Sequence, residues 1–237
     1  MKIKCLVLIV SILFIKSPSF SDGDFIWTQV SGKWDIDLSS NTLIDTKNNT
    51  YQYGYSDLIN NNTLISFRPI DKFTDFSSDI IVSEPVDECH ASVLFSITDH
   101  YRSFYGIRLF GNTESINKLS LIKSDTNDSS LASSVKNNFT IKEIQSVSIK
   151  LSYNSPIKIN IALKRGRIII KLNDKLALEY SAESFTPGSG QIGFSHRNNF
   201  IRVKSVVVTI NKNILFTDDF SKNRIKKYSY TAKPVAN

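Results

Sequence analysis

Two short polar segments hold the residue types that could carry out chemistry in this chain. The first is Asp99, His100, Tyr101 and Arg102, the densest polar and aromatic cluster, and the second is His196 with Arg197. A His/Asp pair can act as acid and base, and the loops at one end of a β-sandwich are where sites usually gather. Because histidine is also common in solvated loops, its presence does not establish catalysis. We therefore predict that both segments bind a ligand, with catalysis as the alternative.

Motifs of the known catalytic and metal-binding types do not occur in the sequence. The three histidines lack the H-x-H or H-E-x-x-H spacing of a zinc site, and neither a G-x-S-x-G elbow nor a P-loop is present. Asp125 and Asp128 lie in a polar stretch that could bind calcium or simply be solvated. We therefore predict no catalytic residue and no cofactor, with calcium left open.

The stretch from Ala91 to Lys123 predicts three short antiparallel strands, around which the rest of the chain is organised. Apolar residues alternate along it, as expected of strands with one buried face; they are Ala91, Val93, Phe95 and Ile97, then Tyr105, Ile107 and Leu109, then Leu119 and Leu121. Arg108 has the opposite parity, so we expect it to point away from the core. It becomes a candidate ligand residue if its strand lines a concave sheet. The alternative is an ordinary solvated face with Lys158 and Lys171.

The remainder of the chain repeats the same pattern of short strands and polar turns. Roughly a dozen strands can be counted, with turns at Gly166 and at Asn173–Asp174, and no convincing amphipathic helix occurs. A change of apolar phase near Lys204 and Ser205 predicts a β-bulge. Trp34 is expected in the core. The fold class indicated is all-β, a two-sheet antiparallel jelly-roll sandwich.

Four segments together resemble the concanavalin A-like lectin/glucanase superfamily, in its laminin-G-like and keto-disaccharide-hydrolase-like branches. They are SGKWDI at 31–36, ASVLFSITDHYRSFYGIRL at 91–109, IIIKLNDKLALEY at 168–180 and GSGQIGF at 188–194. The resemblance spans most of residues 24–210 and implies two antiparallel sheets with a concave outer face that often holds glycans. The glucanase branch uses carboxylates spaced E-x-D-x-x-E, and this sequence lacks that array. The resemblance therefore implies no catalytic site.

The two ends of the chain are expected to lie outside the sandwich. Lys2 and Lys4 precede an apolar run, and Ser19-Phe20-Ser21 offers a cleavage site, so residues 1–21 are predicted to be a secretory signal. The sandwich is placed at 22–220, and residues 221–237 are expected to form a basic tail that frays. Asp218-Asp219-Phe220 echoes the mature start at Asp22, which suggests a repeat of the first strand.

Charge and cysteine content limit the partners of the exported chain. Removal of the signal takes away three lysines and lowers the formal net charge from +7 to +4. So mild a basic balance argues against nucleic acid as a partner, and no transmembrane segment is expected after cleavage. Cys89 then stands alone, and we predict a buried thiol rather than an intermolecular bridge.

These expectations lead to three functional hypotheses. The preferred one is a secreted, periplasmic or envelope-located, non-enzymatic β-sandwich that binds glycan or another surface ligand through Asp99, His100, Tyr101, Arg102, Arg108, His196 and Arg197. The second is a glycan-active hydrolase in which the two histidine segments converge. The third is a structural module of the cell envelope that docks a cell-surface protein.

Overall fold

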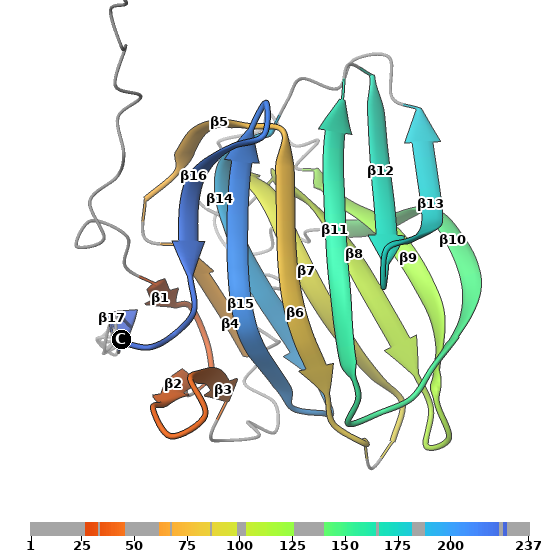
Figure 1. Ribbon diagram of the computed structural model, residues 1–237. Coiled ribbons are helices and arrows are strands. Elements are labelled where there is room, and N and C mark those ends of the chain that lie inside the picture. Colours follow the sequence, from red (N-terminus) through yellow and green to blue (C-terminus); the bar gives the residue numbers. More distant parts are fainter. Residues whose placement is uncertain are drawn as a thin grey trace, which may run out of the picture.

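The computed structural model is built from two β-sheets packed face to face (Figure 1). It describes residues 27–32, 34–45, 62–66, 68–85, 87–98, 103–125, 140–164, 166–181, 188–222 and 225–226. The predicted signal at 1–21, Asp99 to Arg102, Asp128 and the last residues of the predicted tail lie outside the described residues. The described part of the chain includes no helix long and apolar enough to cross a membrane.

Sheet A contains nine strands and is antiparallel except at one edge. In spatial order its path is β10 (Thr140–Leu151), β9 (Ile116–Asp125), β8 (Ser103–Gly111), β7 (Cys89–Thr98), β14 (Gly188–Arg197), β4 (Asn62–Ser66), β1 (Trp27–Gln29) and β17 (Ile225–Lys226). The ninth strand, β5 (Ile70–Phe73), pairs with β14. The predicted three-stranded unit is therefore present as β7, β8 and β9, consecutive in sequence and neighbours in the sheet.

Sheet B contains eight strands and covers the inner side of sheet A. Its path is β13 (Lys175–Ser181), β12 (Arg167–Leu172), β11 (Pro156–Lys164), β6 (Asp75–Val82), β15 (Ile201–Ile210), β3 (Thr42–Asp45) and β2 (Trp34–Asp37), with β16 (Asn213–Asp218) also paired to β15. The predicted turns occur where expected, with left-handed backbone at Gly166, Asn173 and Asp174. The predicted bulge is a register shift between Val203 and Ser205.

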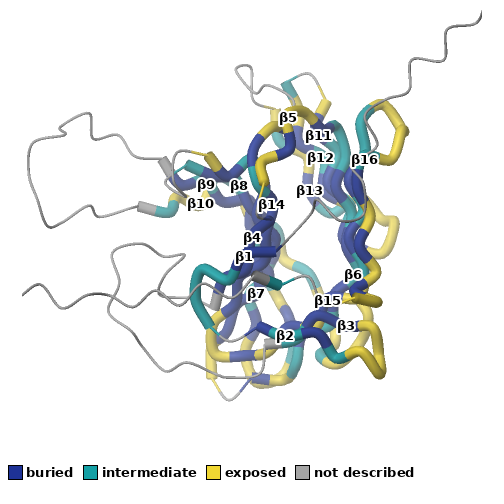
Figure 2. Tube along the Cα trace, turned by 90° about the vertical axis from the view of Figure 1, so that its left-hand side faces the viewer, coloured by how far each residue is buried: buried dark blue, intermediate teal, exposed yellow. Residues whose placement is uncertain are grey.

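The core lies between the two sheets and consists of the inward-pointing residues at alternate positions of their strands. Figure 2 marks the buried residues of both sheets in dark blue. Side chains such as Val93, Ile107 and Leu121 from sheet A meet Phe76 and Ile161 from sheet B. Burying apolar area of this kind is the main driving force for such a sandwich. The predicted all-β jelly-roll fold is confirmed. Trp34 and Cys89 are also buried as predicted, at 0% and 5% exposure.

The segment after Phe220 departs from the expected fraying tail. Ile225 and Lys226 form β17, which pairs in parallel with β1 through Trp27 and Thr28. Phe220 is fully buried, and its ring lies 6.0 Å from that of Trp27. The end of the predicted sandwich thus packs against the first strand and does not repeat it.

A second, smaller apolar cluster lies on the outer side of sheet A, away from sheet B. It contains Ile65, Leu94, Ile97, Phe104 and Ile122, all buried. The expectation that Ile97 continues the inward series of Val93 and Phe95 is corrected, because the strand has a register shift after Phe95. Ser96 has a φ of 53° at this point, and the bulge turns Ile97 to the side of Leu94.

We predict that Gly106 is required for this outer cluster to close. A Cβ at Gly106 would lie 2.9 Å from Leu94 Cδ2 and 3.1 Å from the Val93 carbonyl oxygen, so a side chain there forces its neighbours apart. Gly106→Ala should lower the free energy of unfolding by about 1 kcal/mol and Gly106→Val by more, measured by urea denaturation. Equal stability of both variants with wild type would contradict this packing.

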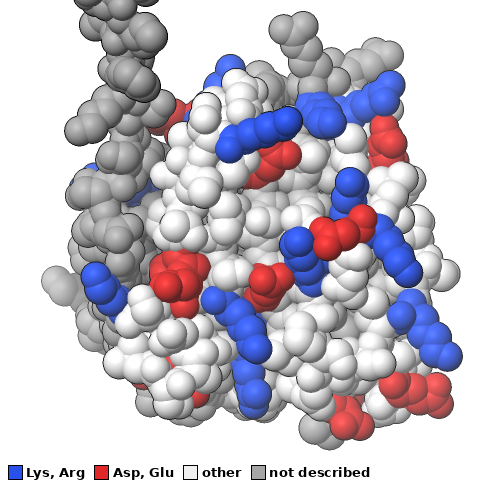
Figure 3. Space-filling view, in the orientation of Figure 1, with Lys and Arg blue, Asp and Glu red and all other residues white. Residues whose placement is uncertain are grey.

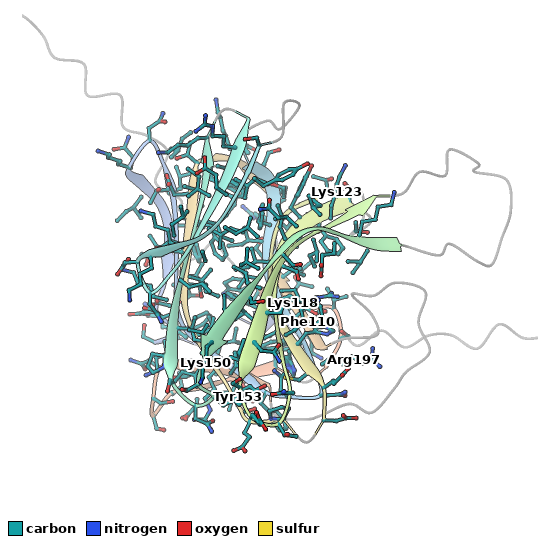
Figure 4. All side chains as sticks on the ribbon, turned by 90° about the vertical axis from the view of Figure 1, so that its right-hand side faces the viewer. Phe110, Lys118, Lys123, Lys150, Tyr153 and Arg197 are labelled. Atoms are coloured by element: carbon teal, nitrogen blue, oxygen red, sulfur yellow. The ribbon has the colours of Figure 1, made fainter. Side chains whose placement is uncertain are left out.

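Sheet A is not flat. The ends of β8, β9 and β10 bend away from sheet B in both side views (Figures 2 and 4). Its outer face is therefore concave along β8, β9 and β10. This is the face to which the parity of Arg108 assigns its side chain.

Candidate ligand-binding face

Strand register aligns the outward side chains of sheet A in rows that cross the strands. One row, here called the serine row, consists of register neighbours from β4 to β10: Thr63, Ser195, Ser92, Arg108, Ser120 and Ser146. The next row, here called the aromatic row, consists of Arg197, His90, Phe110, Lys118 and Ser148. On the other side of the serine row lies the buried apolar cluster of Leu94 and Ile122.

The serine row forms a hydrogen-bonded floor with one long side chain in its centre. Thr63 Oγ1 donates to Ser195 Oγ at 3.1 Å, and Arg108 Nε donates to Ser92 Oγ at 3.1 Å. Ser120 Oγ donates to a Glu143 carboxylate oxygen at 2.7 Å. Four of the five hydroxyl side chains of the row are buried, Ser146 is exposed, and Arg108 is half-buried. The hydroxyls of Ser92 and Ser120 thus position the longer side chains of Arg108 and Glu143, which reach solvent.

The aromatic row presents one ring surrounded by basic groups. Lys118 Nζ lies 4.3 Å from the centroid of Phe110, and Arg108 Cζ lies 5.9 Å from it. The ring of His90 meets Phe110 edge-on with centroids 5.9 Å apart. Phe110, Lys118 and Arg197 all lie on the side of sheet A that faces away from sheet B (Figure 4). Cations at such distances are attracted to an aromatic face and hold its orientation.

His90 is the buried titratable group at the centre of this face. Burial first, and then the positive charges of Arg108 and Arg197, lower the pKa of His90 from 6.5 to about 2. Its Nε2 atom is buried and has no hydrogen-bond partner among the described residues. His90 is therefore an uncharged imidazole at physiological pH.

Glu143 supplies the acidic group of the face. The hydroxyls of Ser120 and Ser146 hydrogen-bond its carboxylate and lower its pKa, with a further contribution from Lys118. Lys118 Nζ lies 3.1 Å from the same carboxylate oxygen. The carboxylate is therefore ionised at neutral pH and is tied to β9.

The structure divides the predicted site residues between two sides of sheet A. Arg108 and Arg197 both point outward, as the half-buried centre of the serine row and the exposed end of the aromatic row. The expected loop position of His196 is corrected, because β14 continues to Arg197 and its alternation turns His196 inward. His196 is fully buried and packs edge-on against Trp34, with centroids 5.4 Å apart. It cannot reach a ligand on the outer face.

Asp99, His100, Tyr101 and Arg102 lie outside the described residues, but the strands that flank them are described. His196 pairs with Ala91 near the start of β7, and the strand ends at Thr98. At 3.2–3.4 Å per residue the two points are on the order of 20 Å apart. This separation counts against a catalytic site that combines His196 with the chain following Thr98.

The suggested alternative, a solvated face shared by Arg108, Lys158 and Lys171, is not present. Lys158 and Lys171 belong to β11 and β12 on the outside of sheet B, across the sandwich from Arg108. Basic and acidic side chains alternate over that surface (Figure 3), for example in the Lys158–Asp174 and Arg167–Glu179 ion pairs at 3.1 and 3.2 Å. Exposed pairs of this kind indicate ordinary solvated surface.

Other candidate chemistry on the described residues is structural. They include no group of three or more His, Cys, Asp or Glu side chains placed to hold a metal ion. Cys89 Sγ lies 3.6 Å from the Tyr153 hydroxyl, and burial raises the pKa of the Cys89 thiol. A raised pKa leaves the thiol protonated and poorly reactive.

Sequence reasoning did not identify His90, Phe110, Lys118 or Glu143. Phe110 has the parity of Arg108 and follows it by two residues, so the signal for it was present in the sequence. Glu143 and Lys118 could be found only through the pairing of β9 with β10. His90 adjoins Arg197 only because β7 pairs with β14.

Comparison with known proteins gives a likeness of fold. No family model and no curated protein sequence matches the chain. Among solved structures, the carbohydrate-binding module CBM66 from Bacillus subtilis has a TM-score of 0.54 at 13% identity, covering 79% of this chain and 92% of that one. The β-glucanase from Bacillus licheniformis has a TM-score of 0.52 at 9% identity, covering 81% and 94%.

A third similar structure, also from Bacillus subtilis, is a protein of unknown function with a galectin-like fold. Its TM-score is 0.51 at 11% identity, over 78% of this chain and 89% of that one. At 13% identity or less, the likeness to these structures is one of fold, and it does not show the keto-disaccharide-hydrolase-like branch. The chain has a concanavalin A-like jelly-roll fold.

Proposed function

We propose that this protein binds glycans on the outer face of sheet A, without catalysing a reaction on them. The observation that carries the proposal is the row arrangement itself. An aromatic ring at Phe110 stands next to Arg108 and within two strands of Glu143, above a floor of ordered hydroxyls. Sugar recognition needs this combination, because a pyranose ring offers an apolar face for stacking and hydroxyls for hydrogen bonds.

The similar structures support the same class of ligand. One is a carbohydrate-binding module and another is a β-glucanase. Function must nevertheless be argued from the site, and in the two rows and their described hydrogen-bond partners the carboxylate is that of Glu143. A retaining or inverting glycosidase uses a pair of carboxyl groups, so the described side chains favour binding over hydrolysis.

The proposal includes export of the protein. The charged start, apolar run and small residues that end at Ser21 support a cleaved signal and a secreted or envelope location. There the protein would meet extracellular or cell-surface polysaccharide. Mass measurement of the purified mature protein tests the cleavage.

The decisive experiment is a glycan-array screen of residues 22–237, run with calcium and with a chelator. A reproducible hit gives the probe for titration calorimetry. A blank array under both conditions contradicts the proposal and leaves docking of a cell-surface protein as the alternative.

We predict that Arg108→Ala weakens binding of the array hit by at least about tenfold. Its guanidinium can make charge-assisted hydrogen bonds to a ligand, which are stronger than neutral ones, and its Cζ atom lies 5.9 Å from the centroid of Phe110. Calorimetry measures the loss, with Lys171→Ala on sheet B as the matched control for a lost surface cation. Equal affinity of Arg108→Ala and Lys171→Ala would place the ligand on another face.

A further inference from the structure

The described charged side chains of the serine row and the aromatic row, together with Glu143, are unequal in sign. Among the described outward residues of the two rows and Glu143, three are cations, namely Arg108, Arg197 and Lys118, and one is an anion. Glu143 is bonded to Lys118 and to Ser120 at the β9–β10 side. The two arginines lie toward the opposite side, on β8 and β14.

Register places these two arginines on either side of one strand. Arg197 on β14 is the cross-strand neighbour of His90 on β7, and His90 is in turn the neighbour of Phe110 on β8. Arg108 precedes Phe110 by two residues and bonds Ser92, which follows His90 by two. Strands β14 and β8 are two sheet spacings apart, roughly 10 Å. Two arginine side chains can close on a common group across that distance.

The residue between them is neutral. Both guanidinium charges contribute to the low pKa of His90, so both act on the same imidazole. Like charges that face one low-dielectric site raise its free energy, and an anion placed there lowers it. His90 stays uncharged and lies on β7, the strand between those that carry the two arginines.

We propose that the glycan bound by this face is acidic, and that a carboxylate or sulfate group on it lies between Arg108 and Arg197 while the adjoining sugar ring stacks on Phe110. Planar guanidinium groups bind carboxylate and sulfate oxygens through paired N–H donors. This inference rests on the proposed glycan-binding function and names the class of glycan.

The test uses pairs of probes that share one sugar backbone and differ in whether it carries an anionic group. One pair is oligogalacturonate and its fully methyl-esterified form, and the other is sulfated and unsulfated N-acetyllactosamine. Wild-type protein is expected to bind the acidic member of at least one pair tenfold or more tightly, by calorimetry at fixed ionic strength. The pair that responds tells a carboxylate from a sulfate.

Arg197→Gln is then expected to reduce that preference for the acidic member at least tenfold. Arg202→Gln is the matched control. Arg202 is exposed on β15 of sheet B, and its substitution removes the same charge from the protein as Arg197→Gln does. Equal loss of preference in both variants would reveal only overall charge attraction and would overturn the inference.

Failure of the inference can be told from failure of the proposed function. Suppose that glycans on the array bind through Arg108. If the acidic and neutral members of both pairs then bind equally, or if neither pair binds, the face does not select an acidic glycan and the inference is wrong. If no glycan on the array binds, the proposed function itself is wrong and the inference falls with it.

Discussion

Asp218→Ala should lower the free energy of unfolding by about 3 kcal/mol, the largest effect expected of a polar substitution in this fold. Trp27 Nε1 donates to Asp218 Oδ2 at 2.8 Å, and the two residues are 0% and 4% exposed. The other carboxylate oxygen accepts the backbone N–H of Phe220 at 2.9 Å. Removing the carboxylate deprives two buried donors of their acceptor, and each such loss costs about 1–3 kcal/mol.

The contact matters because it joins a strand near the start of the described chain to a strand near its end. Trp27 and Asp218 are 191 residues apart in sequence, and β1 and β16 belong to different sheets. Trp27 also packs on Phe194 and Phe216, with centroids 5.8 and 6.5 Å away. Loss of the hydrogen bond therefore loosens the first strand, the site of β17 pairing and the aromatic core together.

Urea denaturation followed by tryptophan fluorescence and circular dichroism measures this effect. Asp218→Asn is the control of matched size, because its amide oxygen can still accept one of the two hydrogen bonds, and it should lose less stability than Asp218→Ala. The neighbouring exposed Asp219→Ala should have a small effect. A loss below about 1 kcal/mol for Asp218→Ala would show that the contact is not a stabilising one.

Much of the fold could be predicted from local alternation. The period of two in Ala91, Val93, Ile107 and Leu109 placed these residues in the core, and the same parity placed Arg108 outside. The change of apolar phase near Lys204 correctly predicted a bulge, whereas the interruption at Ser96 was missed and the prediction for Ile97 was wrong. The bulge at Ser96 turned Ile97 outward, and no feature of the sequence around it marks a left-handed residue.

The candidate site was harder to predict because its residues are neighbours only through non-local pairing. His90 and Arg197 meet across β7 and β14, although three other strands of sheet A, namely β8, β9 and β10, lie between them in sequence. His196 was misplaced because the strand was expected to end near Phe194. The strand continues to Arg197, so its side chains go on alternating between the two faces of the sheet. This alternation buries His196 and exposes Arg197. Chemistry-bearing residue types drew attention to His196, whereas register decides which of them can reach a ligand.

The second large expected effect is acid sensitivity caused by His90. Its pKa is about 2 in the folded protein, whereas an unfolded histidine has a pKa near 6.5. Between these values the unfolded chain binds a proton that the folded chain does not, so stability falls as pH is lowered below about 6.5. Above that pH both states are neutral at this residue and its contribution is constant.

The size of the effect follows from the same linkage. From pH 7 to pH 5 the unfolded histidine becomes almost fully protonated, and the folded state loses about 2 kcal/mol relative to it. His90→Gln removes this titration, so wild type should lose about 2 kcal/mol more than the variant over that interval in urea denaturation. The comparison subtracts carboxylates such as Glu143, whose contribution is common to both proteins.

Ring resonances in NMR provide the direct measurement on the folded protein. The His90 ring signal should not titrate between pH 8 and pH 5, and Arg108→Gln should raise the pKa of His90 because one of the two arginine charges is removed. A His90 midpoint near 6.5, or the same pH dependence of stability in wild type and His90→Gln, would mean that His90 is solvated in the folded protein. His90, Arg108 and Arg197 would then pack less closely than the strand register indicates. The outer face would also lack an uncharged residue between its two arginines.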